Sequence, residues 1–357
     1  MAHPVFDSHV HLWPASAAHS TSHKWMELGG PLTRQYSSTD YLASCPSQPI
    51  GYVYVETDRT LGVVPKDSQS ISSDEWIAYV QQPFEEIKYL RRIVEQNGTL
   101  EDNNPGNSHL LKGIVLWAPL QATPEAFSEY LKEAEREAGP IMWNRVKGFR
   151  FLLQSYNDRS ALRELVFSEN WLQNLIVLGR QGYTFDITVD TKRRGAWQLE
   201  IIAEMIQTLR SLETCNSAKL IIDHLGKPDI GGQFQTQQQI KEFMIWSQAL
   251  EVIAEIPETF MKLSGAFSEM NIQEFASIEE LCKQLEPWLS VIFDTFDAKK
   301  IMFGSDWPVC TVQGFPGSES WKMWHDIVHF ILESRNMTDS EKGDIWYRTA
   351  LQAYGII

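Results

Sequence analysis

The sequence predicts an α/β fold, a single (β/α)₈ barrel of the TIM type whose long first loop forms a lid. Eight short runs rich in apolar and β-branched residues alternate with longer segments that have helical periodicity. Alternation of this kind favours a parallel sheet, and eight strands favour a closed barrel. No linker rich in Pro, Gly or Ser divides the chain, so we expect one domain over residues 1–357. An open, doubly wound sheet is the alternative architecture.

Each expected strand is a run of apolar residues that ends at turn-forming or polar residues. In chain order, the expected strands are Pro4–His11, Ile50–Thr57, Leu111–Leu120, Arg145–Gln154, Thr184–Val189, Lys219–Leu225, Thr259–Ser264 and Lys300–Asp306. The segments between them carry apolar residues three or four positions apart, which indicates amphipathic helices. In the same order, the expected helices are Asp74–Gln96, Pro124–Ala138, Ala161–Gly179, Arg194–Leu212, Gln237–Ile256 and Ile272–Phe296.

Two connections are longer or more polar than a barrel requires. The first, from Leu12 to Pro49, contains only a short helical segment at Ser38–Ser44. Long loops in compact domains are usually functional, so we expect this loop to form a lid over the mouth of the barrel. The second, the stretch "LEDNNPGNSH" that ends at His109, is expected to be a surface loop.

Composition excludes several classes of partner. The chain has 31 Lys and Arg against 46 Asp and Glu, a net charge of −15 that would repel nucleic acid. Its apolar stretches are too short to span a bilayer, and we expect neither a membrane contact nor a secretory signal. The four cysteines are scattered, which is typical of free thiols in a reducing compartment, so we expect a cytoplasmic protein. No residue pattern predicts the oligomeric state.

The first expected strand carries a pair of histidines, His9 and His11, in the motif "DSHVHLW". Residues two apart in a strand point to the same face, which is the interior at the end of a barrel strand. Two adjacent imidazoles can bind one metal ion. With 9 histidines in the chain such a pair can also arise by chance, as two hydrogen-bonded polar residues near a strand end.

Other polar residues fall at the C-terminal ends of the expected strands, the face where barrel enzymes carry out their chemistry. These residues are Glu56, Arg150, Gln154, Asp186, Asp223, His224, Lys262, Ser305 and Asp306. Three imidazoles and a carboxylate at one mouth suit zinc or manganese, and the predicted ligands are His9, His11, His224 and Asp306. The structural alternative for Glu56, Gln154 and Lys262 is a salt bridge or a helix cap.

The predicted catalytic residues are Asp306, His224 and Arg150. A bound ion would lower the pKa of water, and Asp306 would then accept the proton. In an alternative without metal, Asp306 activates water alone, and the histidines and Arg150 stabilise the oxyanion. The predicted substrate-binding residues are Trp13, Trp117, Gln154, Asp186 and Trp307. The three tryptophans follow strands and can stack on a sugar face, or they can simply pack in the core or the lid.

Five motifs in order, one per strand, resemble the amidohydrolase-related family of the amidohydrolase superfamily. They are "DSHVHLW", "GFRFLLQ", "IIDHLGKP", "KLSG" and "FGSDWPV". The resemblance covers nearly the whole chain and points to the branch of sugar-acid and pyrone lactonases. It implies a (β/α)₈ barrel, hydrolysis of a cyclic ester, and a water activated by the aspartate of the last strand, here Asp306. It also implies that Arg150 faces the substrate.

The sequence departs from the binuclear members of that superfamily at two strands. Those members use a lysine or glutamate on the fourth strand to bridge two ions and a histidine on the fifth. Here the fourth strand ends in Arg150 and Gln154, and the fifth carries Asp186. The resemblance therefore implies one divalent cation. It also implies that the cation can be dispensable, since some members of the lactonase branch are thought to work without metal.

The expected substrate is a sugar lactone, with L-rhamnono-1,4-lactone as the first candidate. A dianionic pyrone would require several cations, whereas the strand ends supply Arg150, and Lys227, Arg193 and Arg194 lie in loops. The net charge of −15 also disfavours a dianion. The alternatives are a metal-dependent decarboxylase or a 2-pyrone-4,6-dicarboxylate-type lactonase on the same barrel, and a barrel that binds sugar acids without catalysis.

Overall fold

Eight parallel strands form one sheet, in the order β1-β2-β3-β4-β5-β6-β7-β8. The computed structural model describes residues 3–63, 73–96, 102, 106–212, 218–231, 234–270, 277–313 and 319–357. The strands are β1 (Phe6–Val10), β2 (Gly51–Val55), β3 (Leu111–Trp117), β4 (Val146–Arg150), β5 (Thr184–Ile187), β6 (Lys219–Ile222), β7 (Thr259–Leu263) and β8 (Ile301–Phe303). Each overlaps a predicted strand, so all eight predictions are confirmed. The observed strands are shorter because their C-terminal residues turn away into loops.

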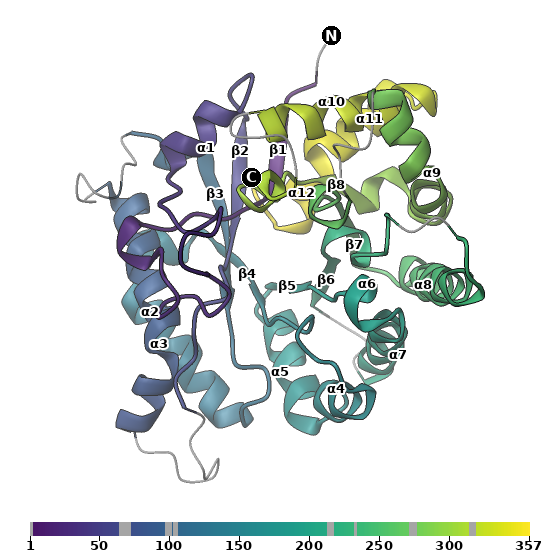
Figure 1. Cartoon of the computed structure of the whole chain (residues 1–357). Coiled ribbons are helices and arrows are strands. Elements are labelled where there is room, and N and C mark those ends of the chain that lie inside the picture. Colours follow the sequence, from purple (N-terminus) through teal and green to yellow (C-terminus); the bar gives the residue numbers. More distant parts are fainter. Residues whose placement is uncertain are drawn as a thin grey trace.

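The sheet closes between its first and last strands (Figure 1). The backbone N–H of His11 donates to the carbonyl of Trp307 at 2.8 Å, and that of Asp306 donates to the carbonyl of His9 at 2.9 Å. The predicted (β/α)₈ barrel is therefore confirmed, and the open sheet is wrong because β1 has a neighbour on both sides. The closure also brings the C-terminal ends of β1 and β8 together, which places His9 beside Asp306.

Helices cover the outside of the barrel (Figure 1). They are α1 (Ser38–Ser44), α2 (Ser73–Glu95), α3 (Pro124–Trp143), α4 (Arg159–Val166), α5 (Glu169–Arg180), α6 (Thr191–Arg194), α7 (Trp197–Leu212), α8 (Gln237–Glu255), α9 (Ile278–Thr295), α10 (Glu319–Ser334), α11 (Asp339–Gly343) and α12 (Thr349–Ala353). Strands buried on both faces read as continuous apolar runs. In β3, for example, Ile114, Val115 and Leu116 are fully buried, and each such side chain stabilises the fold by roughly 1.5–3 kcal/mol.

Three predicted helices differ from the observed ones. The segment Ala161–Gly179 is two helices, because the side chain of Ser168 accepts a hydrogen bond from the backbone of Trp171 and starts α5. Gly195, at φ 109°, separates α6 from α7 within the segment predicted as Arg194–Leu212. The third, Pro124–Ala138, continues to Trp143 across a kink at Gly139.

Some predictions fall on residues that the structure does not describe. These are the start of the helix predicted from Ile272, half of the loop that ends at His109, and Cys215. The described part of the helix predicted from Ile272 is α9, which begins at Ile278. There the Ser277 side chain accepts a hydrogen bond from the backbone N–H of Glu280. The other three cysteines, Cys45, Cys282 and Cys310, are free thiols.

The long first loop is fastened at the mouth of the barrel. Trp13 donates its indole N–H to the carbonyl of Arg34 at 2.6 Å, and Trp25 donates to the carbonyl of Thr57 at 3.0 Å. His23 Nε2 lies 2.9 Å from Thr57 Oγ1, at the end of β2. The loop contains α1, as predicted, and contributes to the wall of the cavity described below. Among the described helices, none combines the length and the apolar character that crossing a bilayer requires.

Candidate active site

Four side chains meet at the C-terminal mouth of the barrel. His9 lies in β1, His11 directly follows it, His224 follows β6 and Asp306 follows β8. Asp306 Oδ1 is 3.7 Å from His9 Nε2, 3.5 Å from His11 Nε2 and 3.8 Å from His224 Nε2. The Nε2 atoms of His9 and His11 are 3.1 Å apart. The structure thus brings together all four residues that the sequence predicts as metal ligands.

Two of these side chains sit on sharp backbone turns. Asp306 has φ 58° and His224 has φ 56°, both in the left-handed region that residues other than Gly rarely adopt. Such conformations cost of order 1–3 kcal/mol each and cluster at active sites. Leu225 and Lys227 continue the left-handed stretch after β6 at φ 57° and 49°. The turns aim His224 and Asp306 back over the end of the barrel.

The ionisation states at neutral pH suit either metal binding or general base catalysis. Burial, together with the Lys262 ammonium, lowers the pKa of His9 well below its usual value. Burial also lowers the pKa of His224 to about 4, although Asp306 opposes the shift. Burial alone would raise the pKa of Asp306, but the neighbouring imidazoles, His224 foremost, outweigh it and hold that pKa below its usual range. His9 and His224 are therefore neutral and Asp306 is a carboxylate.

The spacing of three of these donors fits a single divalent ion. Donors about 2.0–2.2 Å from one zinc ion lie roughly 3.3–3.6 Å apart in a tetrahedron, close to the 3.1–3.7 Å that separate His9 Nε2, His11 Nε2 and Asp306 Oδ1. His224 Nε2 lies 3.8 Å from the same Asp306 oxygen. His9, His11 and Asp306 form one group of potential ligands, and His9, Asp223 and His224 form another. Asp223 lies on the Nδ1 side of His9, at 3.3 Å, away from the Nε2 cluster. It therefore suits support of the His9 ring better than contact with the ion.

A buried charge cluster lies beneath the histidines. Lys262 Nζ, on β7, donates to Asp186 Oδ2 at 2.6 Å and lies 2.9 Å from His9 Nδ1 and 3.0 Å from Asp223 Oδ1. Tyr354 donates to the same Asp186 oxygen at 2.7 Å. Lys262 and both carboxylates are fully buried. The ammonium thus compensates two carboxylates that burial would otherwise destabilise.

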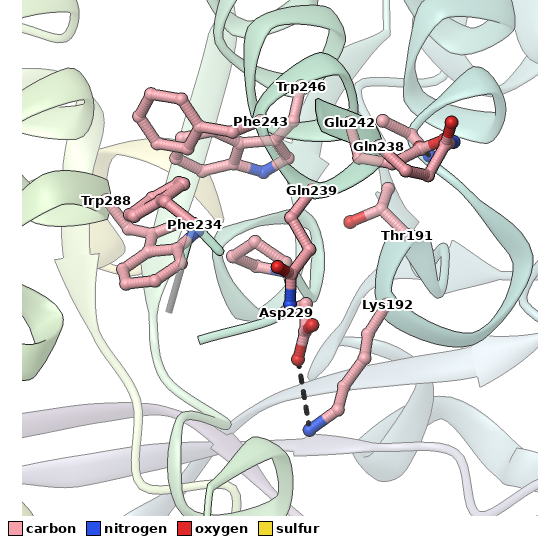
Figure 2. A pocket seen from close by; sticks show the side chains of 12 residues that line it. Thr191, Lys192, Asp229, Phe234, Gln238, Gln239, Glu242, Phe243, Trp246 and Trp288 are labelled. Atoms are coloured by element: carbon pink, nitrogen blue, oxygen red, sulfur yellow. Dashed lines mark hydrogen bonds and ion pairs between the residues drawn. The ribbon is translucent and has the colours of Figure 1, made fainter. Parts of the chain in front are cut away.

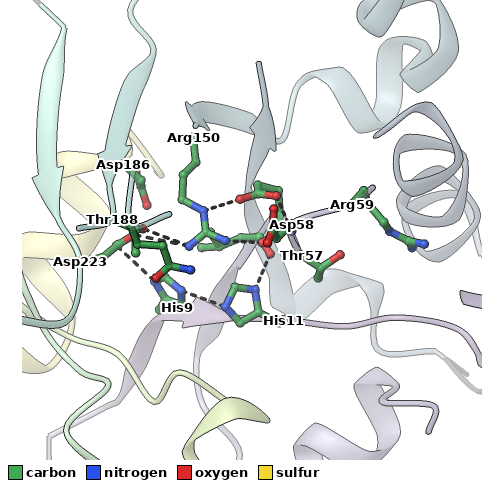
Figure 3. Close-up of polar contacts among 12 residues, drawn as sticks. His9, His11, Thr57, Asp58, Arg59, Arg150, Asp186, Thr188 and Asp223 are labelled. Atoms are coloured by element: carbon green, nitrogen blue, oxygen red, sulfur yellow. Dashed lines mark hydrogen bonds and ion pairs between the residues drawn. The ribbon is translucent and has the colours of Figure 1, made fainter. Parts of the chain in front are cut away.

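A second ion pair forms part of the wall. Arg150 Nε donates to Glu56 Oε1 at 2.6 Å, and a second guanidinium nitrogen donates to the carbonyl of Glu56 (Figure 3). The remaining terminal nitrogen donates to Thr188 Oγ1 at 3.3 Å. Burial raises the pKa of Glu56 to about 7, against the effect of Arg150. The pair holds the guanidinium in a fixed position beside the cavity.

The cavity above these groups has a volume of about 210 Å³. Its lining consists of His11, Trp13, Trp25, Leu32, Thr57, Asp58, Arg150, Leu152, Gln154, Thr188, His224, Lys227, Asp306 and Val309. Apolar and aromatic walls with a few converging polar groups are typical of small-molecule sites. Another hollow lies beside α8, lined by the aromatic residues Phe234, Phe243, Trp246 and Trp288 (Figure 2). It contains none of the predicted site residues, so the candidate site is the cavity at the mouth.

The structure divides the predicted substrate-binding residues into two groups. Trp13 and Gln154 line the cavity, and Gln154 Oε1 accepts a hydrogen bond from Lys227 at 2.8 Å. Trp117, Asp186 and Trp307 do not line it. Trp117 packs its ring against Tyr79, Tyr130 and Phe151, and Trp307 packs against Tyr36 and Tyr41. Asp186 is occupied by Lys262. The predicted substrate contacts of these three residues are therefore not supported by the structure.

Several lining residues were not predicted from the sequence. Thr57 and Asp58 follow β2 and Thr188 follows β5, so the rule that places function at strand ends could have found them. Trp25 and Leu32 lie in the long first loop, where no periodicity indicates which side chains face inward. The sequence placed Lys227 only in a loop. Its contact with Gln154 depends on the left-handed turn after β6.

Comparisons with known proteins agree with this geometry. The sequence model of a protein family described as Amidohydrolase matches residues 111–356. L-rhamnono-gamma-lactonase of Scheffersomyces stipitis is 26% identical over 362 residues, which cover 99% of this chain and 98% of that protein. L-fucono-1,5-lactonase of Burkholderia multivorans is 25% identical over 213 residues, 59% of this chain and 64% of that protein.

Solved structures share the fold. The crystal structure of an amidohydrolase from Burkholderia multivorans with bound zinc superimposes with a TM-score of 0.67. The alignment covers 99% of this chain and 100% of that one at 22% sequence identity.

Proposed function

The chain belongs to the amidohydrolase family, and from this premise we propose that it is a hydrolase that opens the lactone ring of a sugar acid. The observation that carries the proposal is the position of the Asp306 carboxylate, within 3.5–3.8 Å of three imidazole nitrogens at the floor of the cavity. The full-length relative named L-rhamnono-gamma-lactonase supports the substrate class. We take L-rhamnono-1,4-lactone as the first candidate substrate.

Asp306 acts as the general base in this proposal. Its carboxylate accepts a proton from a water molecule as the water oxygen attacks the lactone carbonyl. The acyl–oxygen bond then breaks, and the proton passes from Asp306 to the ring oxygen, which yields the open-chain hydroxy acid. A carboxylate whose pKa is held low is a weak base, so the attacking water needs further activation.

We propose that His9, His11, His224 and Asp306 hold one divalent cation, zinc or manganese. When bound, such an ion lowers the pKa of water from 15.7 to about 7 and polarises a carbonyl. The neutral imidazoles and the spacing of the donors support this assignment. Among the described residues, β4 and β5 offer no ligands of the usual kind for a second ion, because β4 ends in Arg150, which pairs with Glu56, and Asp186 on β5 pairs with Lys262.

Arg150 stabilises the oxyanion that develops on the carbonyl oxygen. Its guanidinium lines the cavity and is fixed by Glu56 and Thr188, so it needs no reorganisation during the reaction. If the ion is dispensable, Asp306 still serves as base, and Arg150 and His224 supply the positive or hydrogen-bonding groups.

The charge of the cavity favours a neutral ring over a dianion. Two acidic residues, Asp58 and Asp306, line it together with two basic ones, Arg150 and Lys227. Arg150 and Lys227 already have protein partners, which leaves little cationic charge for two carboxylates. The indole of Trp13 offers an apolar wall, and Gln154 offers hydrogen bonds to hydroxyl groups.

We also propose that residues 1–357 form one domain and that the protein works in the cytoplasm without nucleic acid or membrane. One sheet that takes strands from Phe6 to Phe303 supports the single domain. Free thiols at Cys45, Cys282 and Cys310 are typical of a reducing compartment. The net charge of −15 disfavours nucleic acid.

A panel of sugar-acid lactones that differ in ring size and hydroxyl configuration tests the function. Ring opening releases a proton near neutral pH, so a pH indicator follows the reaction. We expect turnover of at least one aldonolactone, with L-rhamnono-1,4-lactone foremost. Faster turnover of 2-pyrone-4,6-dicarboxylate, or loss of carboxylate from aromatic acids without lactone turnover, would show that an alternative function is correct.

Elemental analysis of the purified protein tests the metal assignment. We expect at most one equivalent of zinc or manganese per chain, and lower lactone turnover after chelation that the same ion restores. Two equivalents of tightly held ion would contradict the assignment, because the described residues supply one cluster of imidazoles at the mouth.

A further inference from the structure

Lys262 lies beneath His9 and does not line the cavity. It is fully buried on β7, and its ammonium has three polar neighbours. It donates to Asp186 Oδ2 at 2.6 Å, lies 2.9 Å from His9 Nδ1, and forms an ion pair with Asp223 Oδ1 at 3.0 Å. Lys262 therefore affects the site only through the groups that it contacts.

The hydrogen bonds fix which nitrogen of each imidazole carries a proton. His11 Nδ1 faces the carbonyl of Val55 at 2.8 Å, so it carries the proton and leaves a lone pair on Nε2. His9 Nε2 lies 3.1 Å from that lone pair and can donate to it. The Lys262 ammonium can only donate, so His9 Nδ1 accepts. The contacts form one continuous chain from Lys262 through His9 and His11 to Val55.

This arrangement is incompatible with an ion on His9 Nε2. A metal ion needs the lone pair of Nε2, so in the neutral ring the proton has to be on Nδ1. Nδ1 then donates, and the Lys262 ammonium opposite it has lost its acceptor. The overall charge of the ring is unchanged, because the proton leaves Nε2 and another occupies Nδ1 by exchange with water.

Asp223 provides the acceptor that the metal-bound arrangement requires. Its Oδ1 lies 3.3 Å from His9 Nδ1. That oxygen is buried and accepts no hydrogen bond among the described residues, although it lies within ion-pair distance of Lys262. A carboxylate that accepts the second N–H of a metal-bound histidine is a common supporting contact in metal sites. His9 Nδ1 thus has two competing neighbours, one donor and one acceptor.

We propose that Lys262 is a positioning residue that holds His9 in its metal-free arrangement, and that Asp223 favours the metal-bound one. The competition between them sets the affinity of the site for its divalent ion. Like-charge repulsion between the Lys262 ammonium and the ion acts in the same direction as the hydrogen bond. The inference rests on the metal ligands of the proposed function but not on its substrate.

Affinity for zinc, measured by competition with a chromophoric chelator, tests the inference without any lactone. We expect Lys262→Met to raise the affinity roughly tenfold, because it removes the donor that opposes the Nδ1 proton. Asp223→Asn is expected to lower the affinity about 10- to 100-fold. A residue with a purely structural role would lower the affinity in both variants. Equal or parallel changes in the two variants would overturn the inference.

Lys262→Met leaves the buried carboxylates of Asp186 and Asp223 without their cation, which destabilises the fold. The double variant Asp186→Asn/Lys262→Met removes a carboxylate as well as the ammonium and should bind zinc more tightly than Asp186→Asn alone. Nitrogen-15 chemical shifts of His9 in the wild-type protein give an independent readout. We expect the proton on Nε2 in metal-free protein and on Nδ1 with zinc bound; a proton on Nδ1 in both states would overturn the inference.

The two proposals fail separately. Opposite affinity shifts without turnover of any lactone would leave the inference intact and reject the proposed substrate class. Lactone turnover by a protein that binds no zinc in any variant would reject the inference and leave the metal-free route to hydrolysis.

Discussion

Arg150 and Lys262 are both buried cations paired with carboxylates inside the barrel, yet they occupy the site in different ways. The guanidinium of Arg150 lines the cavity and uses three of its five N–H donors on Glu56 and Thr188. The ammonium of Lys262 lies below the cavity, where it contacts Asp186, His9 and Asp223. Arg150 can therefore still bind an oxyanion, whereas Lys262 can act only through His9.

The contacts of each side chain explain the difference. Arg150 is the last residue of β4, and its guanidinium reaches the wall of the cavity. Lys262 lies within β7, and its ammonium contacts Asp186, Asp223 and His9, none of which lines the cavity. The same ion-pair chemistry thus serves recognition in one case and positioning in the other.

The largest expected effect is the loss of stability in a variant that lacks Arg150. Arg150→Met leaves the buried carboxylate of Glu56 without its cation, and we expect it to reduce the free energy of unfolding by about 3–5 kcal/mol. Arg150→Met/Glu56→Gln removes both charges and should recover most of that loss. Urea denaturation of both variants measures the difference. If the single variant were as stable as the wild type, the pair could not be what fixes the guanidinium.

The pH dependence of stability tests the Glu56 side of the pair. Burial raises the pKa of Glu56 from 4.5 to about 7, so the folded state retains a proton that the unfolded state has lost. Stability from this group is present below about pH 4.5 and is lost as the pH rises through 7, by about 3 kcal/mol. Glu56→Gln mimics the protonated form, so the wild type should lose stability relative to it between pH 5 and pH 8.

Thermal unfolding of wild type and Glu56→Gln across that pH range measures the effect. A wild type that gains stability relative to the variant as the pH rises would show the opposite: Arg150 would then lower the pKa of Glu56 below its ordinary value, and pairing would outweigh burial.

The smallest expected effect separates two tryptophans that the sequence could not distinguish. Trp13 lines the cavity and Trp117 does not. We expect Trp13→Phe to raise KM for the lactone about two- to tenfold, since a ring contact contributes roughly 0.5–1.5 kcal/mol. Trp117→Phe is the matched control and should leave KM within about twofold. Steady-state kinetics on both variants would contradict the placement if Trp117→Phe had the larger effect.

The sequence predicted the fold because each barrel strand is a buried apolar run with a helix after it. The same logic located His9, His11, His224 and Asp306, because polar residues at the ends of such runs share one mouth. The expectation of a single ion came instead from the family resemblance, because Arg150 and Asp186 stand where two-metal members carry ligands.

The sequence could not show which of the residues around these four side chains line the cavity. Trp117 and Trp307 follow strands just as Trp13 follows β1, and the direction of each ring depends on packing partners distant in the chain. Asp186 faces Lys262, 76 residues away, so its role depends on the closed barrel. No helix was predicted after the last expected strand, whereas the structure has α10, α11 and α12 there.

Turnover of L-rhamnono-1,4-lactone by the wild type and by Asp306→Asn tests the central claim most directly. The variant keeps the shape of the side chain and removes the base, so we expect kcat/KM to fall about 10²- to 10⁴-fold. Asp326→Asn, at a partly exposed carboxylate on α10 that is paired with Lys322, is the control and should retain wild-type activity. Equal turnover by wild type and Asp306→Asn would contradict the account.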